Sequence, residues 1–150
     1  EYTPVGDVYV AEAASEDCVA FGGEPSGSWI WPDRTLCPDG PLAAATVAAL
    51  DAARALSARA AEVPDYPIRR DSIEVDGKRA VMDSVRETVL ETYYDVTTLD
   101  GVRVDLGDAW FLLRASGTQP LVRVTAEARE ASRADSVFQE ARALVADAGE

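Results

Sequence analysis

The sequence contains no histidine, and of its 14 basic residues only Lys78 is a lysine. The absence of histidine excludes serine-histidine and cysteine-histidine nucleophile pairs, and it excludes every metal site built on imidazole. Against these few basic residues stand 27 acidic ones, which give a net charge of −13. Such an acid excess repels nucleic acid and anionic membranes, so we expect neither among the partners.

The acid excess and the near absence of lysine also predict a protein kept soluble in concentrated salt, where screening removes most of the self-repulsion. No apolar stretch is long enough for a membrane span, and no basic segment followed by an apolar core marks a secretory signal. We therefore expect a halophilic, cytoplasmic protein. Cys18 and Cys37 allow at most one disulfide, and two free, buried thiols are the favoured interpretation.

Two regions of different pattern are separated by the segment 63–67, in which two prolines flank Asp65. After this segment, apolar alternation predicts strands over 72–75, 95–99, 102–106, 110–113 and 121–126. Asp100-Gly101 is a hairpin signal between two of them. Helical periodicity predicts one helix carrying Met82, Val85, Val89 and Tyr93, and a last helix capped by Ser132 that stops at Gly149.

Before the segment, the pattern predicts a helix over 7–14, strands over 18–21 and 28–31, and a long alanine-rich helix that ends before Val63. Asp39 is the predicted cap of the long helix, with Pro41 in its first turn. This set is too small to close a sheet, so we interpret it as the second half of an α/β domain.

The loop GGEPSG, residues 22–27, places a carboxylate at Glu24 and a hydroxyl at Ser26 on one bend. An acceptor and a donor-acceptor from one loop suit the neighbouring hydroxyls of a sugar, and an ordinary glycine-proline turn is the alternative. Trp29 and Trp31 follow on the next predicted strand. They fit a core, although an exposed tryptophan could also flank a sugar ring.

The bend RASGT, residues 114–118, joins two predicted strands and combines Arg114, two hydroxyls and a glycine. A phosphate needs donors from several directions, namely a guanidinium fork, hydroxyls and backbone N–H groups that glycine allows to approach. Arg123 adds a second fork if its strand folds back beside the bend. The alternative interpretation is a polar hairpin with two salt-bridged arginines.

The motif GGEPSG, followed by RASGTQPLVRVTAEA and preceded by TPVGDVYV, resembles the α-D-phosphohexomutase family of phosphoglucomutases, phosphomannomutases and phosphoglucosamine mutases. The resemblance implies that Glu24 and Ser26 hold sugar hydroxyls. It also implies a phosphate-binding loop, helped by Arg123, whose members are Arg114, Ser116, Gly117 and Thr118. Two residues depart from the family pattern: Ser28 stands where histidine is frequent, and Gln119 where glutamate is frequent.

The implied fold class is α+β. We expect a C-terminal two-layer domain, an antiparallel four-stranded sheet with helices on one face as in the TATA-binding protein. The C-terminal half of an α/β/α domain 3 would precede it. The expected boundaries are residues 1–62 for the part of domain 3, 63–70 for a hinge, and 71–150 for the phosphate-binding domain 4.

The implied reaction interconverts hexose 1-phosphate and hexose 6-phosphate through a bisphosphorylated sugar. The family's phosphoserine segment and its magnesium-binding aspartate-glycine loop do not occur in this sequence. We therefore expect the C-terminal piece of a longer, haloarchaeal enzyme, inactive alone and without a cofactor of its own. Its expected partners are the hexose phosphate and the missing N-terminal domains, where Mg²⁺ would bind. A non-catalytic anion-binding or protein-interaction module is the alternative.

Overall fold

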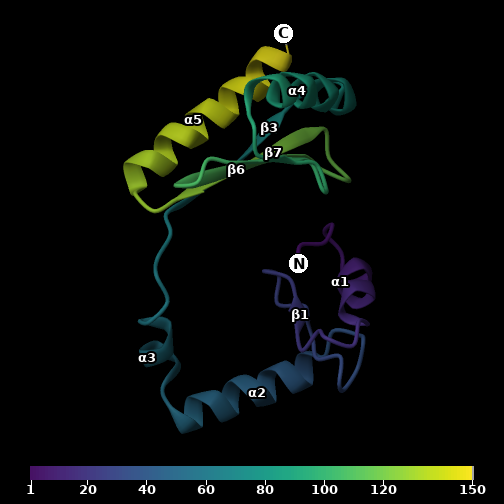
Figure 1. The fold of residues 1–150 in the computed structure, drawn as a ribbon, viewed down its shortest axis with the longest axis vertical. Helices are drawn as coiled ribbons and strands as arrows, with labels where there is room; N and C mark the ends of the chain where they lie inside the picture. The colour runs from purple at the N-terminus through teal and green to yellow at the C-terminus, as the bar shows by residue number, and fades with distance from the viewer. Residues whose placement is uncertain (150) are drawn as a thin grey trace. The chain divides into compact units, whose positions relative to one another are not determined.

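The computed structural model describes residues 1–149 of the chain and divides into two compact units, with the boundary between Pro64 and Asp65 (Figure 1). Residues 68–70, which we expected at the end of the hinge, are already part of a strand, because they pair with the strand that follows the RASGT bend. Among residues 1–149, no helix combines the length and the apolar character that a bilayer crossing requires.

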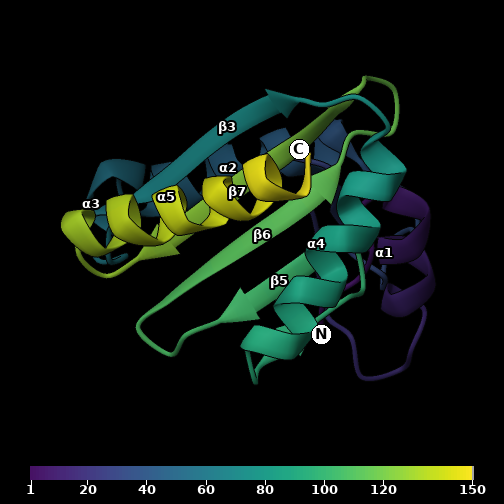
Figure 2. The ribbon, with the colours of Figure 1, turned by 90° about the horizontal axis from the view of Figure 1, so that it is seen from above.

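The second unit is an antiparallel sheet with two helices on one face (Figure 2). The order of its strands is β3-β7-β6-β5-β4, so the sheet has five strands and not the predicted four. The apolar pattern predicts this fifth strand, over 95–99, although the family resemblance implies only four; it is the short edge strand β4, which forms two pairs with β5. The elements of this unit are β3 (Ile68–Glu74), α4 (Lys78–Thr92), β4 (Val96–Thr97), β5 (Val102–Asp105), β6 (Ala109–Ala115), β7 (Leu121–Ala128) and α5 (Ala131–Ala148).

The core of the second unit follows from apolar alternation along the strands. Every second residue of β5, β6 and β7 is buried against α4 and α5, and Phe111, Leu113, Val122 and Val124 are fully buried. The residues between them project from the face that the helices leave open. The sheet therefore has one dry face under the helices and one face that carries polar side chains.

The two helices begin differently. Helix α4 starts after Gly77, which adopts the left-handed conformation with φ 68°, as expected of an aspartate-glycine turn. Helix α5 starts at Ala131, and its N-cap is Glu130 without a side-chain bond. The predicted cap at Ser132 is therefore wrong: the chain leaves β7 and enters the helix directly, which places Ser132 in the first turn. The predicted stop at Gly149 is confirmed.

The first unit has little regular structure. Its elements are α1 (Asp7–Ala14), β1 (Gly22–Gly23), β2 (Trp29–Ile30), α2 (Gly40–Ala53) and α3 (Leu56–Ala60). The predicted strand over 18–21 is wrong, because pairing with β2 begins only at Gly22. Helix α1 packs closely on this hairpin: a Cβ at Gly22 would lie 2.9 Å from Cγ1 of Val10.

Helix α2 begins as predicted, with Oδ1 of Asp39 accepting a hydrogen bond of 2.8 Å from Leu42 N. It does not continue to residue 62. Arg54 is extended, and the carboxylate of Asp51 accepts a bond of 2.8 Å from Leu56 N, which starts the short helix α3. The two cysteines are free as predicted, but both are exposed and not buried, because they lie in loops outside the small core.

Candidate functional site

The RASGT bend lies at the turn between β6 and β7. In the strand register Arg114 stands directly opposite Arg123, and Ser116 N donates a bond of 2.9 Å to Leu121 O. Only residues 117–120 remain as the tip of the loop. The strand that carries Arg123 thus folds back beside the bend, which brings two guanidinium groups to one end of the sheet.

Arg114 and Arg123 both project from the open face of the sheet, since their neighbours Leu113 and Val122 are buried under the helices. Like charges directly opposite each other across two strands are destabilising. One of them is partly compensated, because Nη1 of Arg114 donates a bond of 2.8 Å to Oδ2 of Asp100. A guanidinium has five N–H groups, so this pair leaves donors for an anion.

The partner of Arg114 is placed by a glycine. Gly101, next to Asp100, has φ +89°, and a Cβ there would lie 2.3 Å from the carbonyl oxygen of Leu113. Only glycine fits this close approach of the hairpin turn to β6. The Asp100-Gly101 turn was predictable from the sequence, whereas no local pattern indicates that the aspartate reaches Arg114.

The tip of the loop combines bound and unbound backbone groups. The hydroxyl oxygen of Ser116, a residue only 4% exposed, accepts a bond of 3.3 Å from Gln119 N. Within residues 1–149, the N–H groups of Gly117 and Thr118 form no hydrogen bond. Two adjacent backbone donors without partners are the elements from which proteins build anion-binding concavities.

A further residue, which the sequence did not indicate, contacts this loop from helix α4. Nζ of Lys78, the first residue of α4, donates bonds of 2.6 Å to Ser116 O and 2.9 Å to Gln119 O. The two contacts span about forty residues of sequence, so no local pattern could reveal them. The one feature of the sequence that set Lys78 apart is that the other 13 basic residues are arginines.

Arg123 borders a shallow hollow of about 420 Å³ on the open face of β3 and β7. Arg70, Ser72 and Thr125 line the same hollow, and Arg70 was missed because it lies in the segment that we expected to be a hinge. No ion pair within residues 1–149 involves Arg70 or Arg123. Asp71 lines the hollow as well, and its carboxylate pairs with Arg142 at 3.3 Å. The hollow therefore combines two arginines that form none of these ion pairs with one carboxylate that already has a partner.

The GGEPSG loop is the turn of the hairpin between β1 and β2, in the first unit. Oε1 of Glu24 accepts a bond of 2.9 Å from Gly6 N, and Oε2 accepts one of 3.3 Å from Oγ of Ser26. The two predicted sugar-binding side chains therefore contact each other. The bond from Gly6 brings the TPVGDVYV segment against the loop, a contact that sequence analysis did not foresee.

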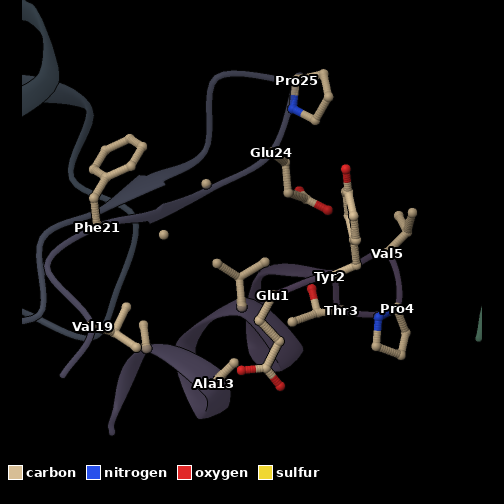
Figure 3. A pocket seen from close by; sticks show the side chains of 14 residues that line it. Glu1, Tyr2, Thr3, Pro4, Val5, Ala13, Val19, Phe21, Glu24 and Pro25 are labelled. Carbon is tan, nitrogen blue, oxygen red and sulfur yellow. The ribbon is translucent and has the colours of Figure 1, made fainter. Parts of the chain in front are cut away.

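Glu24 also borders a cavity of about 570 Å³ inside the first unit. The cavity lies between the N-terminal segment with Tyr2 to Val5, helix α1 and the hairpin residues Phe21 and Glu24 (Figure 3). Trp29 and Trp31 are half-buried and meet the ring of Phe21 edge to face. The distances between ring centroids are 6.3 Å for Trp29 and 5.3 Å for Trp31. The aromatic cluster thus supports the hairpin from one side and remains accessible in part.

The structure offers no metal centre within residues 1–149: these residues contain no group of three or more cysteine, histidine or acidic side chains that could hold an ion.

Comparison with family models matches both units. The description "Phosphoglucomutase/phosphomannomutase, alpha/beta/alpha domain III" matches residues 1–66, and "Phosphoglucomutase/phosphomannomutase, C-terminal domain" matches residues 42–144. Two similar relatives are each described as "Probable phosphoglucosamine mutase". The relative from Methanopyrus kandleri is 48% identical over 92% of this chain, and that from Methanococcoides burtonii is 43% identical over 97%. The chain covers 31% and 34% of these relatives, about a third of their length.

Solved structures agree. A phosphoglucomutase/phosphomannomutase family protein from Burkholderia thailandensis superimposes with a TM-score of 0.80 at 25% identity, over 97% of this chain and 32% of that one. An N-acetylphosphoglucosamine mutase from Aspergillus fumigatus, solved with GlcNAc-6P and magnesium, has a TM-score of 0.56 at 22% identity, covers 77% of this chain, and supports the fold alone.

Proposed function

The chain belongs to the phosphoglucomutase/phosphomannomutase family, and from that premise we propose that it is the substrate-binding, C-terminal part of a phosphohexomutase. In this proposal the enzyme interconverts hexose 1-phosphate and hexose 6-phosphate through a bisphosphorylated sugar. The RASGT loop holds the phosphate that is not being transferred, and the GGEPSG loop holds sugar hydroxyls. The serine and Mg²⁺ that would transfer the phosphoryl group belong to the expected N-terminal domains.

The observation that carries the proposal is the group of donors at the β6–β7 turn. Arg114 and Arg123 stand opposite each other, and the free N–H groups of Gly117 and Thr118 follow at the tip. Two guanidinium forks and two backbone donors supply the several directions from which a phosphate is bound. In a chain with net charge −13, two arginines placed directly opposite each other support an anionic ligand that bridges them.

For the sugar, we propose a hexosamine phosphate, because the two relatives above are described as phosphoglucosamine mutases. Glu24 suits the role of a hydroxyl acceptor, since a carboxylate has about four lone-pair sites and, within residues 1–149, accepts two hydrogen bonds here. Ser26 already donates to Glu24, so a bound sugar would share or replace that bond.

The expected N-terminal domains are the proposed partners, and helix α2 supports this. Only Ala43 is buried in it, while Leu50 is 42% exposed, although the helix consists almost entirely of apolar residues. Apolar side chains of this kind are normally covered. A halophilic, cytoplasmic enzyme remains our expectation from composition alone.

A phosphate titration of the 150-residue chain tests the binding loop. We expect the amide signals of Gly117 and Thr118 to shift in NMR spectra as inorganic phosphate is added. Arg123→Gln should weaken binding about tenfold or more, because a charge-assisted bond is lost. Arg129→Gln, which removes the same charge beyond the other end of β7, should leave binding unchanged. Loop signals that do not respond to phosphate in the unaltered chain would reject the site.

A chimera tests the enzymatic proposal. This chain would replace the corresponding segment of the Methanococcoides burtonii relative, and conversion of glucosamine 6-phosphate to the 1-phosphate would be assayed. We expect turnover by the chimera, none by the chain alone, and a loss of about 10- to 100-fold in kcat/KM with Arg114→Gln. Turnover that is insensitive to Arg114 would contradict its role in phosphate binding. Turnover by the isolated chain would contradict the proposal that the transferring groups belong to other domains.

A further inference from the structure

Lys78 and the peptide between Ser116 and Gly117 form an arrangement that the proposed function does not use. The ammonium group donates to Ser116 O at 2.6 Å and to Gln119 O at 2.9 Å. An ammonium has three N–H donors and no acceptor, so it selects carbonyl oxygens and turns them toward itself. The conformation of the loop tip is thus coupled to a residue at the start of α4.

The geometry of the peptide bond extends this effect to the other side of the loop. A peptide unit is planar and trans, so the C=O of Ser116 and the N–H of Gly117 point in opposite directions. When Lys78 fixes this carbonyl, it also directs the N–H of Gly117 away from α4. That N–H has no hydrogen-bond partner within residues 1–149, and a Cβ built on Gly117 would meet no atom within 4 Å.

The second contact has a different role. Gln119 precedes Pro120, whose nitrogen carries no hydrogen, so turning the Gln119 carbonyl directs no donor. The bond to Gln119 O instead fixes the position of the ammonium group through a second acceptor. Val75 N also donates to Pro120 O at 3.1 Å. Hydrogen bonds to backbone carbonyls of the loop therefore come from two places: from Val75, just after β3, and from Lys78 at the start of α4.

We propose that Lys78 is a positioning residue for phosphate binding: it holds the Ser116–Gly117 peptide in the orientation that presents the Gly117 N–H to the anion. The inference rests on the proposed function of the RASGT loop. Without Lys78 the peptide is free to rotate, and its carbonyl could then face the anion and repel it. Lys78 itself does not touch the phosphate in this proposal.

The test compares the full chain with Lys78→Met and with Arg79→Met, both studied by NMR. Arg79 is the exposed neighbour on the same helix, so its replacement removes the same charge but no loop contact. Before phosphate is added, residual dipolar couplings of Gly117 N–H report the direction of this bond. We expect the coupling to change in Lys78→Met and to be retained in Arg79→Met, while the sheet amides of both variants match the unaltered chain.

Titration with inorganic phosphate is the second measurement. In Lys78→Met we expect the affinity to fall about tenfold or more, and the Gly117 amide should no longer be the signal that moves most. The side-chain Nε–H signals of Arg114 and Arg123 should still respond. Lys78→Arg, which keeps the charge and can donate to the same carbonyls, should restore at least part of the affinity and of the Gly117 response.

The outcomes separate the two proposals. If phosphate moves the loop signals of the unaltered chain and Lys78→Met binds it equally well, Lys78 has no positioning role, while the proposed function stands. A positioning role is also rejected if Arg79→Met weakens binding as much, because charge alone would then explain the loss. If phosphate leaves the unaltered loop unchanged, the proposed function fails, and the inference about Lys78 fails with it.

Discussion

The two units present their loops on very different supports. The RASGT loop connects two long strands in the middle of a sheet whose dry face is covered by α4 and α5. The GGEPSG loop connects two-residue strands over a core that consists of Val10, Ala14 and Ile30. The difference indicates that the second unit holds its loop by its own packing, whereas the described part of the first unit contributes little beyond local hydrogen bonds.

The largest effect on the free energy of unfolding is expected from truncating a core side chain of the second unit. Phe111 is fully buried and contacts the ring of Tyr93 edge to face at 5.5 Å. Phe111→Ala should cost about 3–5 kcal/mol of unfolding free energy, a large share of the roughly 5–15 kcal/mol of a typical domain. Ile30→Ala, the matched change in the first unit, should leave the unfolding of the second unit unaltered. Urea unfolding followed by NMR signals of each unit measures both.

A single common transition that both substitutions shift by similar amounts would contradict this difference between the units. The two units would then unfold together, and the weak core of the first unit would be compensated by contacts with the second. Separate transitions, with the first unit unfolding at lower urea concentration, would show that the second unit is stable by its own packing.

A smaller effect concerns how the second unit supports its loop through the hairpin turn. Gly101→Ala should destabilise by about 2–4 kcal/mol, because left-handed backbone strain adds to a clash with the Leu113 carbonyl. Gly107 also has positive φ, at +81°, but a Cβ there would meet open space. Gly107→Ala should therefore cost only about 1–2 kcal/mol.

Phosphate titration distinguishes these two glycine variants further. Gly101→Ala should also weaken phosphate binding. Displacement of the turn moves Asp100 away from Arg114, and the guanidinium then loses the hydrogen bond that fixes its position. Equal stabilities of the two variants in urea, or unaltered phosphate binding by Gly101→Ala, would show that the turn does not position the ion pair.

The smallest effect is a pH dependence restricted to the second unit. Burial, and then the bond of 2.5 Å from Tyr93 Oη to Glu140 Oε1 and the charge of that carboxylate, raise the pKa of Tyr93. A group whose pKa is raised by folding contributes stability below its unfolded pKa, about 10 for tyrosine, and this contribution is lost as the pH rises above that value.

Urea midpoints at pH 8 and above pH 10 test this dependence. The unaltered second unit should lose stability over that interval, and Tyr93→Phe should lose less. At pH 8 the variant should be weaker by about 0.5–1.5 kcal/mol, the value of one hydrogen bond. A parallel loss in both proteins would show that the phenol is not responsible.

The second unit was largely predictable because a single covered face imposes alternation on each strand. The buried valines of β5 and β7 follow from this, and helical spacing predicts the buried Val85 and Val89 on α4. Val81, which is also buried, was not among the predicted residues. The first unit was less predictable. Its alanine-rich helix has no apolar stripe to mark its end, and the bond from Leu56 N to Asp51 decides where it stops.

The candidate site was predictable in its residue types and not in its contacts. The motif identified Arg114 and Arg123 as neighbours, since a tight turn returns the chain along the same path. Asp100 and Lys78 reach the loop from other elements, and nothing in the local sequence specifies which side chain a folded sheet brings to a given turn. Ser116 was expected to face the ligand, but it also closes the loop through Gln119 N.

The order of strands also has a consequence for self-association. The two outermost strands are β3 and β4, and an outer strand offers unpaired backbone groups to other molecules. β4 is too short to serve as a template. β3 is long enough, but Arg69, Arg70, Asp71 and Glu74 place charges on both of its faces, and such charges oppose the stacking of identical chains. The charges on β3 thus oppose the formation of fibrils through this edge of the sheet.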